Sequence, residues 1–527
     1  MMNAAGTLSF ALAKLHDLPA LSERLGTPLA AEDVSAILEE ASRFAEERIA
    51  PGRLKADRAG CVLENGRVRT PAHYAGLLAE WREAGWQGVA APVEHGGQGL
   101  PHAIWAAVFE LASSADMAFA LMPMLTAGAV DLLAHHATPD QAARFLPPLI
   151  SSAWNGTMCL TEPQAGSDLS AIRTRAVPDG NGYRISGQKI FITWGENDIA
   201  ENTLHLVLAR LPDAPAGSRG ISLFACPKIL PDGRRNGLRC GGIEEKPGIH
   251  ASPTCTMLFD EAEAELVGEV NRGLPAMFAM MNAARLAVGV EGVGQCARAT
   301  VLAEAYAAER VQGGQPIASY PDVARMLGEM RAITQAARLL ALDCAVSLDR
   351  ARAGEAGAET RLALLTPIVK AWCTDRGVEV ASLGIQVHGG AGYVEETGAA
   401  QIWRDARIAP IYEGTNGIQA MDLLARKLPR ELPAFLALLR EAEQAHPALE
   451  EPARALAQAA GELAAAPAAQ AGAAAMPFLD AAGCVLGGAW LARAAAADPA
   501  FEAEATFFLR RLLPRAKARL AEAMAPA

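Results

Sequence analysis

The chain has 527 residues, of which 51% are hydrophobic and 20% are charged, so its composition excludes an intrinsically disordered protein. A single hydrophobic core stops growing at about 250–300 residues, and two to four packed units are therefore expected. The formal net charge of -12 argues against a protein that binds nucleic acid or anionic lipid non-specifically, although a local positive patch could still hold a phosphorylated ligand.

The nine cysteines are scattered singly along the chain, with no Cys-x-x-Cys and no Cys/His cluster at the spacing of metal ligands. This pattern predicts reduced thiols, a cytoplasmic protein and no metal site. The N-terminus has no basic region before its short apolar stretch, so we expect no signal peptide. Charges such as Asp131, Asp480 and Arg493 interrupt the longest apolar windows, and we expect no membrane span.

Helical periodicity comes first along the chain. Ile37, Ala41 and Phe44 fall on one face of a helix, and residues 104–136 continue the pattern. Residues 33–155 are therefore predicted to form an N-terminal α-helical domain. From 156 to 268 the chain changes to short β-rich runs separated by Gly, Pro and Asp, at intervals typical of sandwiches and barrels. We predict a middle β domain over this stretch.

Helical periodicity returns at Gly273, and residues 269–427 are predicted to form a C-terminal helical bundle. One apolar helix face is formed by Val323, Leu327, Met330, Ala337 and Leu340. Residues 428–527 are rich in alanine and carry no recognisable site. They are predicted to form an additional helical domain for packing or subunit contact, with a Pro/Ala/Gly linker between helix pairs near 464–477.

Gly292, Gly294 and Ala297 formally fit the fingerprint of a dinucleotide-binding loop. That loop needs a preceding strand, whereas these residues lie in a region of helical periodicity, so close helix packing is the better interpretation. The sequence contains no phosphate-binding P-loop, zinc-protease or serine-hydrolase motif. The chemistry must be carried by other residues.

The stretch MCLTEPQAGSD, from Met158 to Asp168, places hydroxyl groups and a turn between two apparent strands. Its hydroxyls and backbone amides could meet around a polar ring, although an ordinary turn would show the same composition. The stretch resembles a signature of acyl-CoA dehydrogenases, and ISGQKIFIT, from Ile185 to Thr193, follows it at the spacing of that family. The resemblance extends over about residues 33–427.

The resemblance implies an α+β fold: an N-terminal α-helical domain, a middle β barrel or sandwich, a C-terminal four-helix bundle and an extra helical tail. It also implies non-covalent FAD between the β domain and the bundle. Ser167 is expected near the substrate thioester, and the residues expected to hold the flavin ring are Leu160, Thr161, Phe191 and Thr193. An aromatic ring such as that of Phe191 can stack on isoalloxazine, although an ordinary core aromatic is the alternative.

A second group of motifs comprises QVHGGAGYVEETG, residues 386–398, and WRDARIAPIYEGTNGIQ, residues 403–419. Its glycines allow close backbone approach or positive φ, which suits a loop against a pyrophosphate and equally a plain turn. The residues that the resemblance assigns to the adenosine-diphosphate part of FAD are Gln386 and Gly390 from the neighbouring subunit, Thr415, and Arg310 at the pyrophosphate. For Arg310 the alternative is a solvated arginine on a helix surface.

Glu413, in IYEGT, aligns with the catalytic glutamate of the family, although an isolated glutamate is usually a solvated carboxylate. One branch of the family carries its base on a helix, directly before an arginine. The matching position here is Ala284, which cannot accept a proton, so Glu413 is the candidate base. Arg285 matches the family arginine near that base and is expected in the substrate site, where its charge could position Glu413 or shift the pKa of Glu413.

The implied reaction is the α,β-dehydrogenation of an acyl-CoA thioester to the trans-2-enoyl-CoA, with Glu413 as the α-proton base and hydride transfer from the β-carbon to FAD. Details outside the motifs resemble the 3-methylmercaptopropionyl-CoA dehydrogenase type, which has a C-terminal extension. That thioester or a fatty acyl-CoA is therefore the expected substrate. The resemblance also implies an electron-transfer flavoprotein as acceptor and a homo-oligomer, for which we favour a dimer.

Two alternatives stay open at this point. The first is an acyl-CoA oxidase, in which oxygen reoxidises FAD. The second is a catalytically silent relative that binds acyl-CoA or acts as a scaffold. An intact Glu413 and two flavin motifs argue against the second alternative.

Overall fold

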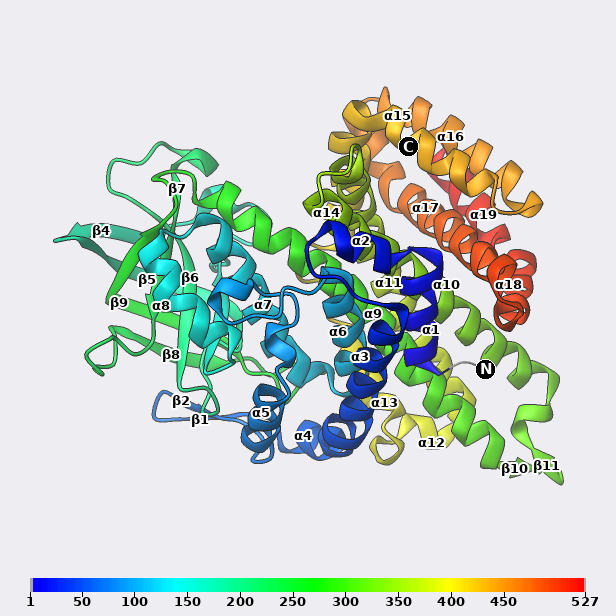
Figure 1. Cartoon of the computed structure of the whole chain (residues 1–527), viewed down its shortest axis with the longest axis horizontal. Helices are drawn as coiled ribbons and strands as arrows, with labels where there is room; N and C mark the ends of the chain where they lie inside the picture. Colours follow the sequence, from blue (N-terminus) through cyan, green and yellow to red (C-terminus); the bar gives the residue numbers. More distant parts are fainter. Residues whose placement is uncertain (1–2, 526–527) are drawn as a thin grey trace. The chain divides into compact units, whose positions relative to one another are not determined.

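The computed structural model describes residues 3–525, apart from the side chain of residue 279 (Figure 1). By its internal contacts the chain divides into two compact units. Unit 1 holds the residues up to Glu47, Pro101–Ala115 and the residues from Arg285 onward, and unit 2 holds Arg48–Leu100 and Asp116–Ala284. Both units combine separate stretches of sequence, so the four predicted domain boundaries stay predictions.

Unit 2 contains a seven-stranded sheet in the order β3-β6-β4-β5-β9-β7, with β8 paired to β9. Because β6 also pairs with β7, the path from β6 through β4, β5, β9 and β7 returns to β6 and the sheet closes on itself. The predicted β-rich stretch is confirmed. The strands are β3 (Trp154–Cys159), β4 (Arg175–Asp179), β5 (Gly182–Thr193), β6 (Asn202–Arg210), β7 (Ile221–Pro227), β8 (Leu238–Ile243) and β9 (Thr254–Val267).

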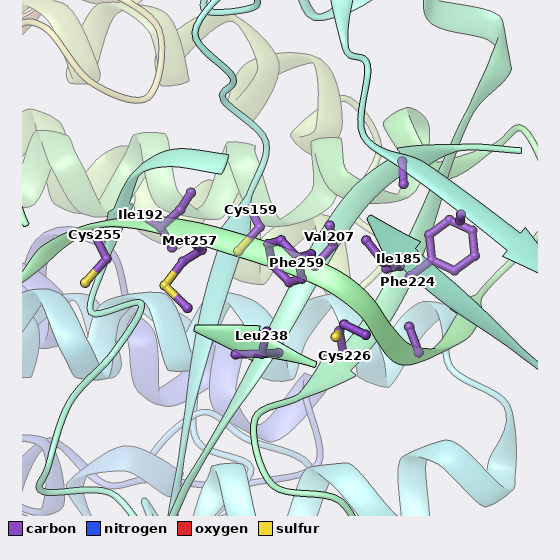
Figure 2. Close-up of a cluster of buried hydrophobic side chains, with 14 of the residues drawn as sticks. Cys159, Ile185, Ile192, Val207, Phe224, Cys226, Leu238, Cys255, Met257 and Phe259 are labelled. Carbon is purple, nitrogen blue, oxygen red and sulfur yellow. The ribbon is translucent and has the colours of Figure 1, made fainter. Parts of the chain in front are cut away.

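The interior of this sheet is a cluster of buried apolar side chains (Figure 2). Cys159 of β3, Ile185 of β5, Phe224 of β7 and Phe259 of β9 are each at most 4% exposed. Side chains alternate between the two faces of a strand, so one residue in two can point into this interior. Burial of one large apolar side chain typically contributes about 1.5–3 kcal/mol. The cluster therefore holds the strands that carry part of the candidate site.

Two helices of unit 2, α7 (Met117–His136) and α8 (Pro139–Ile150), begin at capping residues, Asp116 and Thr138. The carboxylate of Asp116 accepts hydrogen bonds from the backbone N–H groups of Ala118 and Phe119, and Tyr74 Oη donates to its other oxygen at 2.7 Å. Such caps satisfy N–H groups that the first helical turn leaves without partners. The elements are α4 (Arg53–Ala59), α5 (Tyr74–Glu83), α7 (Met117–His136), α8 (Pro139–Ile150) and a hairpin of β1 (Val62–Glu64) and β2 (Arg67–Arg69).

Unit 1 is helical, apart from a hairpin of β10 (Val311–Gln312) and β11 (Gln315–Pro316). Helix α9 (Gly273–Glu309) begins in unit 2 and continues in unit 1, and it starts at the glycine where helical periodicity returns in the sequence. The other helices are α1 (Ala4–Phe10), α2 (Leu18–Arg24), α3 (Ala31–Phe44), α6 (His102–Ala115), α10 (Pro321–Arg352), α11 (Ala358–His388), α12 (Gly390–Tyr393), α13 (Ala399–Ala406), α14 (Asn416–Met421), α15 (Leu428–Glu443), α16 (Glu450–Ala464), α17 (Ala468–Ala497), α18 (Glu502–Phe507) and α19 (Pro514–Ala523).

Glycines on α9 allow neighbouring helices to come close. A Cβ atom added at Gly292 would lie 2.4 Å from the carbonyl oxygen of Cys373 on α11. A Cβ atom added at Gly294 would lie 2.4 Å from Ser113 Oγ on α6. Larger residues would force these helices apart, so the packing interpretation of this glycine pair is confirmed and the dinucleotide fingerprint is excluded.

The C-terminal extension packs on the bundle through α17. Gly483 faces Trp372 of α11, because a Cβ atom at this glycine would lie 2.3 Å from Trp372 Cγ. The predicted linker near 464–477 is wrong: α16 continues to Ala464 and α17 already begins at Ala468. Alanine has the highest helix propensity of all residues, and here it outweighs Pro477 and the glycines of this stretch.

The N-terminal helices attach to the same extension. Leu8 of α1 and Leu12 are fully buried, and the ring of Phe10 lies 5.1 Å from that of Phe501. The ring of His16 lies 4.5 Å from that of Trp490 on α17. The N-terminal helices and the C-terminal extension therefore share one core in unit 1.

Three described helices are long and apolar enough to cross a membrane, by length and composition alone: α7, α9 and α17. The expectation that charges keep the apolar windows too short to cross a membrane is therefore wrong for these helices, because an isolated charge such as Asp131 does not end a helix. The protein itself buries 83% of the apolar window in α7 and in α17, and 65% in α9. The absence of a membrane span stays a prediction.

Candidate active site

In unit 2, the two sequence motifs expected around the flavin lie side by side. The backbone N–H of Ile190 in β5 donates to the carbonyl of Thr161 at 2.9 Å. Lys189 Nζ donates to the carbonyl of Leu160 at 2.9 Å and to Glu162 Oε1 at 2.8 Å. The structure therefore brings Leu160 and Thr161 next to the end of β5.

The ion pair of Lys189 and Glu162 is buried on both sides. Burial alone would raise the pKa of Glu162, but the charge of Lys189 and hydrogen bonds to the carboxylate lower that pKa to about 2. The backbone N–H groups of Arg173 and Thr174 donate to this carboxylate at 2.7 and 3.0 Å. A carboxylate with this many donors is ionised, and it fixes the turn that follows β3.

Phe191 points away from the sheet interior. The pairing of β5 with β9 shifts register between Lys189 and Ile192, and Phe191 has a φ of 59°. Such irregularities re-aim a side chain, and they occur often beside functional sites. The Phe191 ring is 58% exposed, which excludes the core-aromatic alternative. Thr161 and Thr193 are partly buried and Ser167 is exposed. An exposed ring flanked by hydroxyl groups suits a flat, polar ring such as a flavin.

In unit 1, Glu413 lies on a short loop between α13 and α14. The backbone N–H of Asn416 donates to the carbonyl of Pro410 at 3.0 Å and closes this loop. Glu413 has a φ of 57°, a conformation that costs a residue with a Cβ atom of order 1–3 kcal/mol. Arg285 Nε and Gln419 Nε2 each donate to the Glu413 carbonyl at 3.3 Å. The surrounding bonds thus hold Glu413 in a strained conformation.

Asn416 fixes the end of the same loop to α11. Lys370 Nζ donates to Asn416 Oδ1 at 2.9 Å, and Asn416 Nδ2 donates to Asp375 Oδ1 at 2.8 Å and to Thr374 Oγ1 at 3.0 Å. Lys370 is fully buried, so its charge acts on its surroundings without screening by water. Burial lowers the pKa of Lys370 to about 8, although the charge of Glu413 opposes this.

The electrostatic environment of Glu413 suits a proton acceptor. Burial raises the pKa of Glu413 to about 7, and the positive charges of Arg285 and Lys370 limit the rise. A base is most effective when its pKa lies near the working pH. Within the described residues, the backbone N–H of Glu413 donates no hydrogen bond. Ala284 lies on α9 directly before Arg285 and offers no second base.

The other predicted residues of unit 1 divide into two groups. Thr415 lies two residues after Glu413. It caps α14, because its Oγ1 accepts a hydrogen bond from the N–H of Ile418 at 3.3 Å. Arg310 and Gln386 are exposed near the far ends of α9 and α11, where the rings of Tyr306 and His388 stack at 4.4 Å. Arg310 is the residue after α9, and with a rise of about 1.5 Å per residue it lies about 38 Å from Arg285 along the helix axis.

The glycines near Gln386 serve different purposes. Gly389 has a φ of 61° and ends α11, whereas Gly390 is exposed with open space around it. A Cβ atom at Gly392 would lie 2.5 Å from the carbonyl of Ile385, so Gly392 serves chain packing. Gly389 and Gly390 therefore suit a backbone that approaches a phosphate group, and Gly392 does not.

Sequence reasoning missed the buried and partly buried polar residues that support the site. They are Lys189, Glu162, Lys370, Asn416, Glu291 and Tyr412. A signal was present for two of them: Lys370 and Glu291 are charged residues in stretches that are otherwise apolar or small. Charged residues are almost never fully buried without a partner, so such positions predict a buried polar network.

Comparison with known proteins gives matches over most of the chain. The family descriptions "Acyl-CoA dehydrogenase, N-terminal domain", "middle domain" and "C-terminal domain" match residues 31–153, 157–262 and 271–428. A 3-methylmercaptopropionyl-CoA dehydrogenase from Ruegeria pomeroyi is 51% identical over 419 residues, covering 76% of this chain and 71% of the relative.

Two solved structures extend the comparison. A structure described as the electron transferring flavoprotein of Acidaminococcus fermentans covers 74% of this chain and 96% of its own, with a TM-score of 0.64 and 28% identity. An acyl-CoA dehydrogenase from Bacillus anthracis complexed with FAD covers 94% of this chain and 88% of its own, with a TM-score of 0.79 and 22% identity. Coverage of 94% means that the shared fold includes the C-terminal extension.

Proposed function

The chain belongs to the acyl-CoA dehydrogenase family, whose members are FAD-dependent oxidoreductases, and we propose that Glu413 is the base that removes the α-proton of its acyl-CoA substrate. The observation that carries the proposal is the environment of Glu413. Its carboxyl has a pKa of about 7, and it lies on a strained loop that Arg285, Gln419 and Asn416 hold in place.

The residues of this loop can perform proton abstraction. The α-proton of a thioester is acidic, because the negative charge left behind spreads onto the carbonyl oxygen. The carboxylate of Glu413 takes this proton, and the free backbone N–H of the same residue is proposed to donate to the thioester oxygen. Bound FAD would supply the acceptor for the β-hydrogen and the electron pair of its C–H bond, as the α,β double bond requires.

We propose that residues of the motifs described above contact the cofactor and the substrate. The exposed ring of Phe191 supports the assignment of the unit 2 motifs to the flavin. The proposed flavin contacts are Leu160, Thr161, Phe191 and Thr193, and the proposed contacts of the adenosine diphosphate are Arg310, Gln386, Gly390 and Thr415. Ser167 and Arg285 are proposed to contact the substrate.

The substrate we propose is 3-methylmercaptopropionyl-CoA, which the 51% identity to the Ruegeria enzyme supports, with a fatty acyl-CoA as the alternative. Under anaerobic conditions, the visible spectrum of the purified enzyme should bleach when the substrate is added. Titration with 3-methylmercaptopropionyl-CoA, butyryl-CoA and octanoyl-CoA, at equal concentrations, ranks the candidates. Faster bleaching by a fatty acyl-CoA would contradict the proposed substrate, and an unchanged spectrum with every thioester would contradict the proposed reaction.

The pH dependence tests the assigned base. Only ionised Glu413 accepts a proton, so the rate constant for flavin reduction should rise with pH through about 7. The charge of Arg285 lowers the pKa of Glu413, so Arg285→Gln should move this acidic limb to higher pH. Stopped-flow reduction over a pH series measures the shift. Arg454→Gln, which changes an exposed residue of α16, is the control, and an acidic limb that stays in place in Arg285→Gln would contradict the assignment.

We further propose an electron-transfer flavoprotein as the electron acceptor, a homodimer as the assembly and a cytoplasmic location. The wide separation of Arg310 from Arg285 along the axis of α9 supports a contribution from two subunits to one cofactor site. Nine free cysteines support a reducing compartment. A tetramer in light scattering would contradict the dimer.

A further inference from the structure

Glu291 has a buried carboxyl group that contacts the Glu413 loop and has no role in the proton abstraction described above. It lies on α9, six residues after Arg285, and is fully buried. The hydroxyl of Tyr412, the residue before Glu413, donates to Glu291 Oε2. Its second oxygen, Oε1, has no hydrogen-bond partner among the described residues.

The surroundings favour the uncharged form of Glu291. Burying an ionised carboxylate costs far more than burying a neutral acid, unless the charge is paired. The groups that face Glu291 are Tyr412 and Glu413 on the loop and Lys370 on α11. The ammonium group of Lys370 donates to Asn416 instead of Glu291. Burial, together with the nearby charge of Glu413, raises the pKa of Glu291 to about 8.

A neutral carboxylic acid at Glu291 can hold the loop in place without adding a negative charge near Glu413. Tyr412 immediately precedes the strained Glu413, so fixing the Tyr412 hydroxyl restricts the backbone that carries the base. An ionised Glu291 would place a second negative charge near Glu413 and oppose its ionisation. A protonated Glu291 accepts the Tyr412 hydrogen bond without adding this charge.

We propose that Glu291 is a positioning residue, which as an uncharged carboxylic acid holds Tyr412 and thereby fixes the carboxyl of Glu413 for proton abstraction. The proposal rests on the assignment of Glu413 as the base. It also implies that a rise in pH sufficient to ionise Glu291 disturbs the site, because two carboxylates then repel each other.

Four variants of the full-length holoenzyme test this inference. Glu291→Gln keeps an acceptor for Tyr412 and cannot ionise, whereas Glu291→Ala and Tyr412→Phe each remove the hydrogen bond. Thr300→Val is the matched control, because Thr300 is another buried polar residue on α9 whose Oγ1 donates to Cys296 O at 2.8 Å. FAD content is measured for each variant, and stopped-flow flavin reduction by an acyl-CoA is followed across the pH range.

Glu291→Gln should reduce its flavin at close to the wild-type rate near pH 7 and lose the decline expected of the wild type above about pH 8. Glu291→Ala and Tyr412→Phe should be slower by roughly 10- to 100-fold, the effect typical of a misplaced catalytic group, and Thr300→Val should match the wild type. A Glu291→Gln enzyme as slow as Glu291→Ala would show that the charge is needed and would overturn the inference. Wild-type rates in Glu291→Ala would also overturn it.

The same assay distinguishes this inference from the assignment of the base. If Glu413→Gln still reduces the flavin at the wild-type rate, Glu413 is not the base and the proposed function fails. If Glu413→Gln is inactive while Glu291→Gln and Glu291→Ala both behave as wild type, the base stands and only the role of Glu291 fails.

Discussion

Replacement of Glu413 by glutamine is expected to lower the rate constant for flavin reduction by about 10²–10⁴-fold, which is the contribution typical of a positioned general base. Glutamine has nearly the same size as glutamate and lacks a group that can accept the α-proton. The backbone contacts of Arg285 and Gln419 to residue 413 do not involve the carboxyl, so the loop should keep its conformation. Stopped-flow mixing with an acyl-CoA under anaerobic conditions measures the rate.

Two controls define this result. Glu413→Gln should bind FAD and a non-reacting acyl-CoA as the wild type does, which shows that the site is intact. Glu451→Gln changes an exposed glutamate of α16 that pairs with Lys517 at the surface, and its rate should match the wild type. A Glu413→Gln enzyme within tenfold of the wild-type rate would mean that another group accepts the proton.

Replacement of Lys189 by methionine is the second change with a large expected effect. It leaves the carboxylate of Glu162 buried without its cation, and breaking a buried pair in this way typically costs about 3–5 kcal/mol. It also removes the hydrogen bond to the carbonyl of Leu160. The turn after β3 should therefore loosen, the thermal midpoint should fall and the ratio of bound FAD to protein should decrease.

The double variant Lys189→Met/Glu162→Gln separates charge from shape. The N–H groups of Arg173 and Thr174 donate to different oxygens of Glu162, and glutamine keeps one of these two acceptors and carries no charge, so part of the lost stability and FAD content should return. Lys517→Met, which breaks an exposed pair, should leave both quantities unchanged. An unchanged thermal midpoint and FAD content in Lys189→Met would show that the buried pair does not hold the cofactor motif.

Sequence patterns predicted those strands, helix ends and packing glycines whose structure depends on neighbouring residues in the chain. The β-rich runs form the closed sheet, α9 begins at Gly273, and Gly292 and Gly294 serve helix packing as expected. The linker near 464–477 failed because turn residues were weighed above the helix propensity of alanine. Its sequence of small residues instead forms the start of α17, whose later glycines let Trp372 approach.

The candidate site was predicted in part. Glu413 and the flavin motifs are recognisable from sequence, but their supporting residues come from elements that are distant in the chain. Lys189 pairs with Glu162 because β5 lies beside the turn after β3, and Tyr412 donates a hydrogen bond to Glu291, which is 121 residues away in the sequence. Periodicity reports which face of an element is buried and not which partner it meets, so such pairs required the structure.

The most direct test of the account is hydrogen exchange at the α-carbon of a bound thioester. An acyl-CoA analogue with sulfur in place of the β-carbon has acidic α-hydrogens and no β-hydrogen, so proton abstraction can be observed without oxidation. In deuterated buffer, the wild-type enzyme should exchange these hydrogens for deuterium, detected by mass spectrometry, and Glu413→Gln should do so at least about 10²-fold more slowly. Equal exchange by the two enzymes would show that the proton is taken by a group other than Glu413.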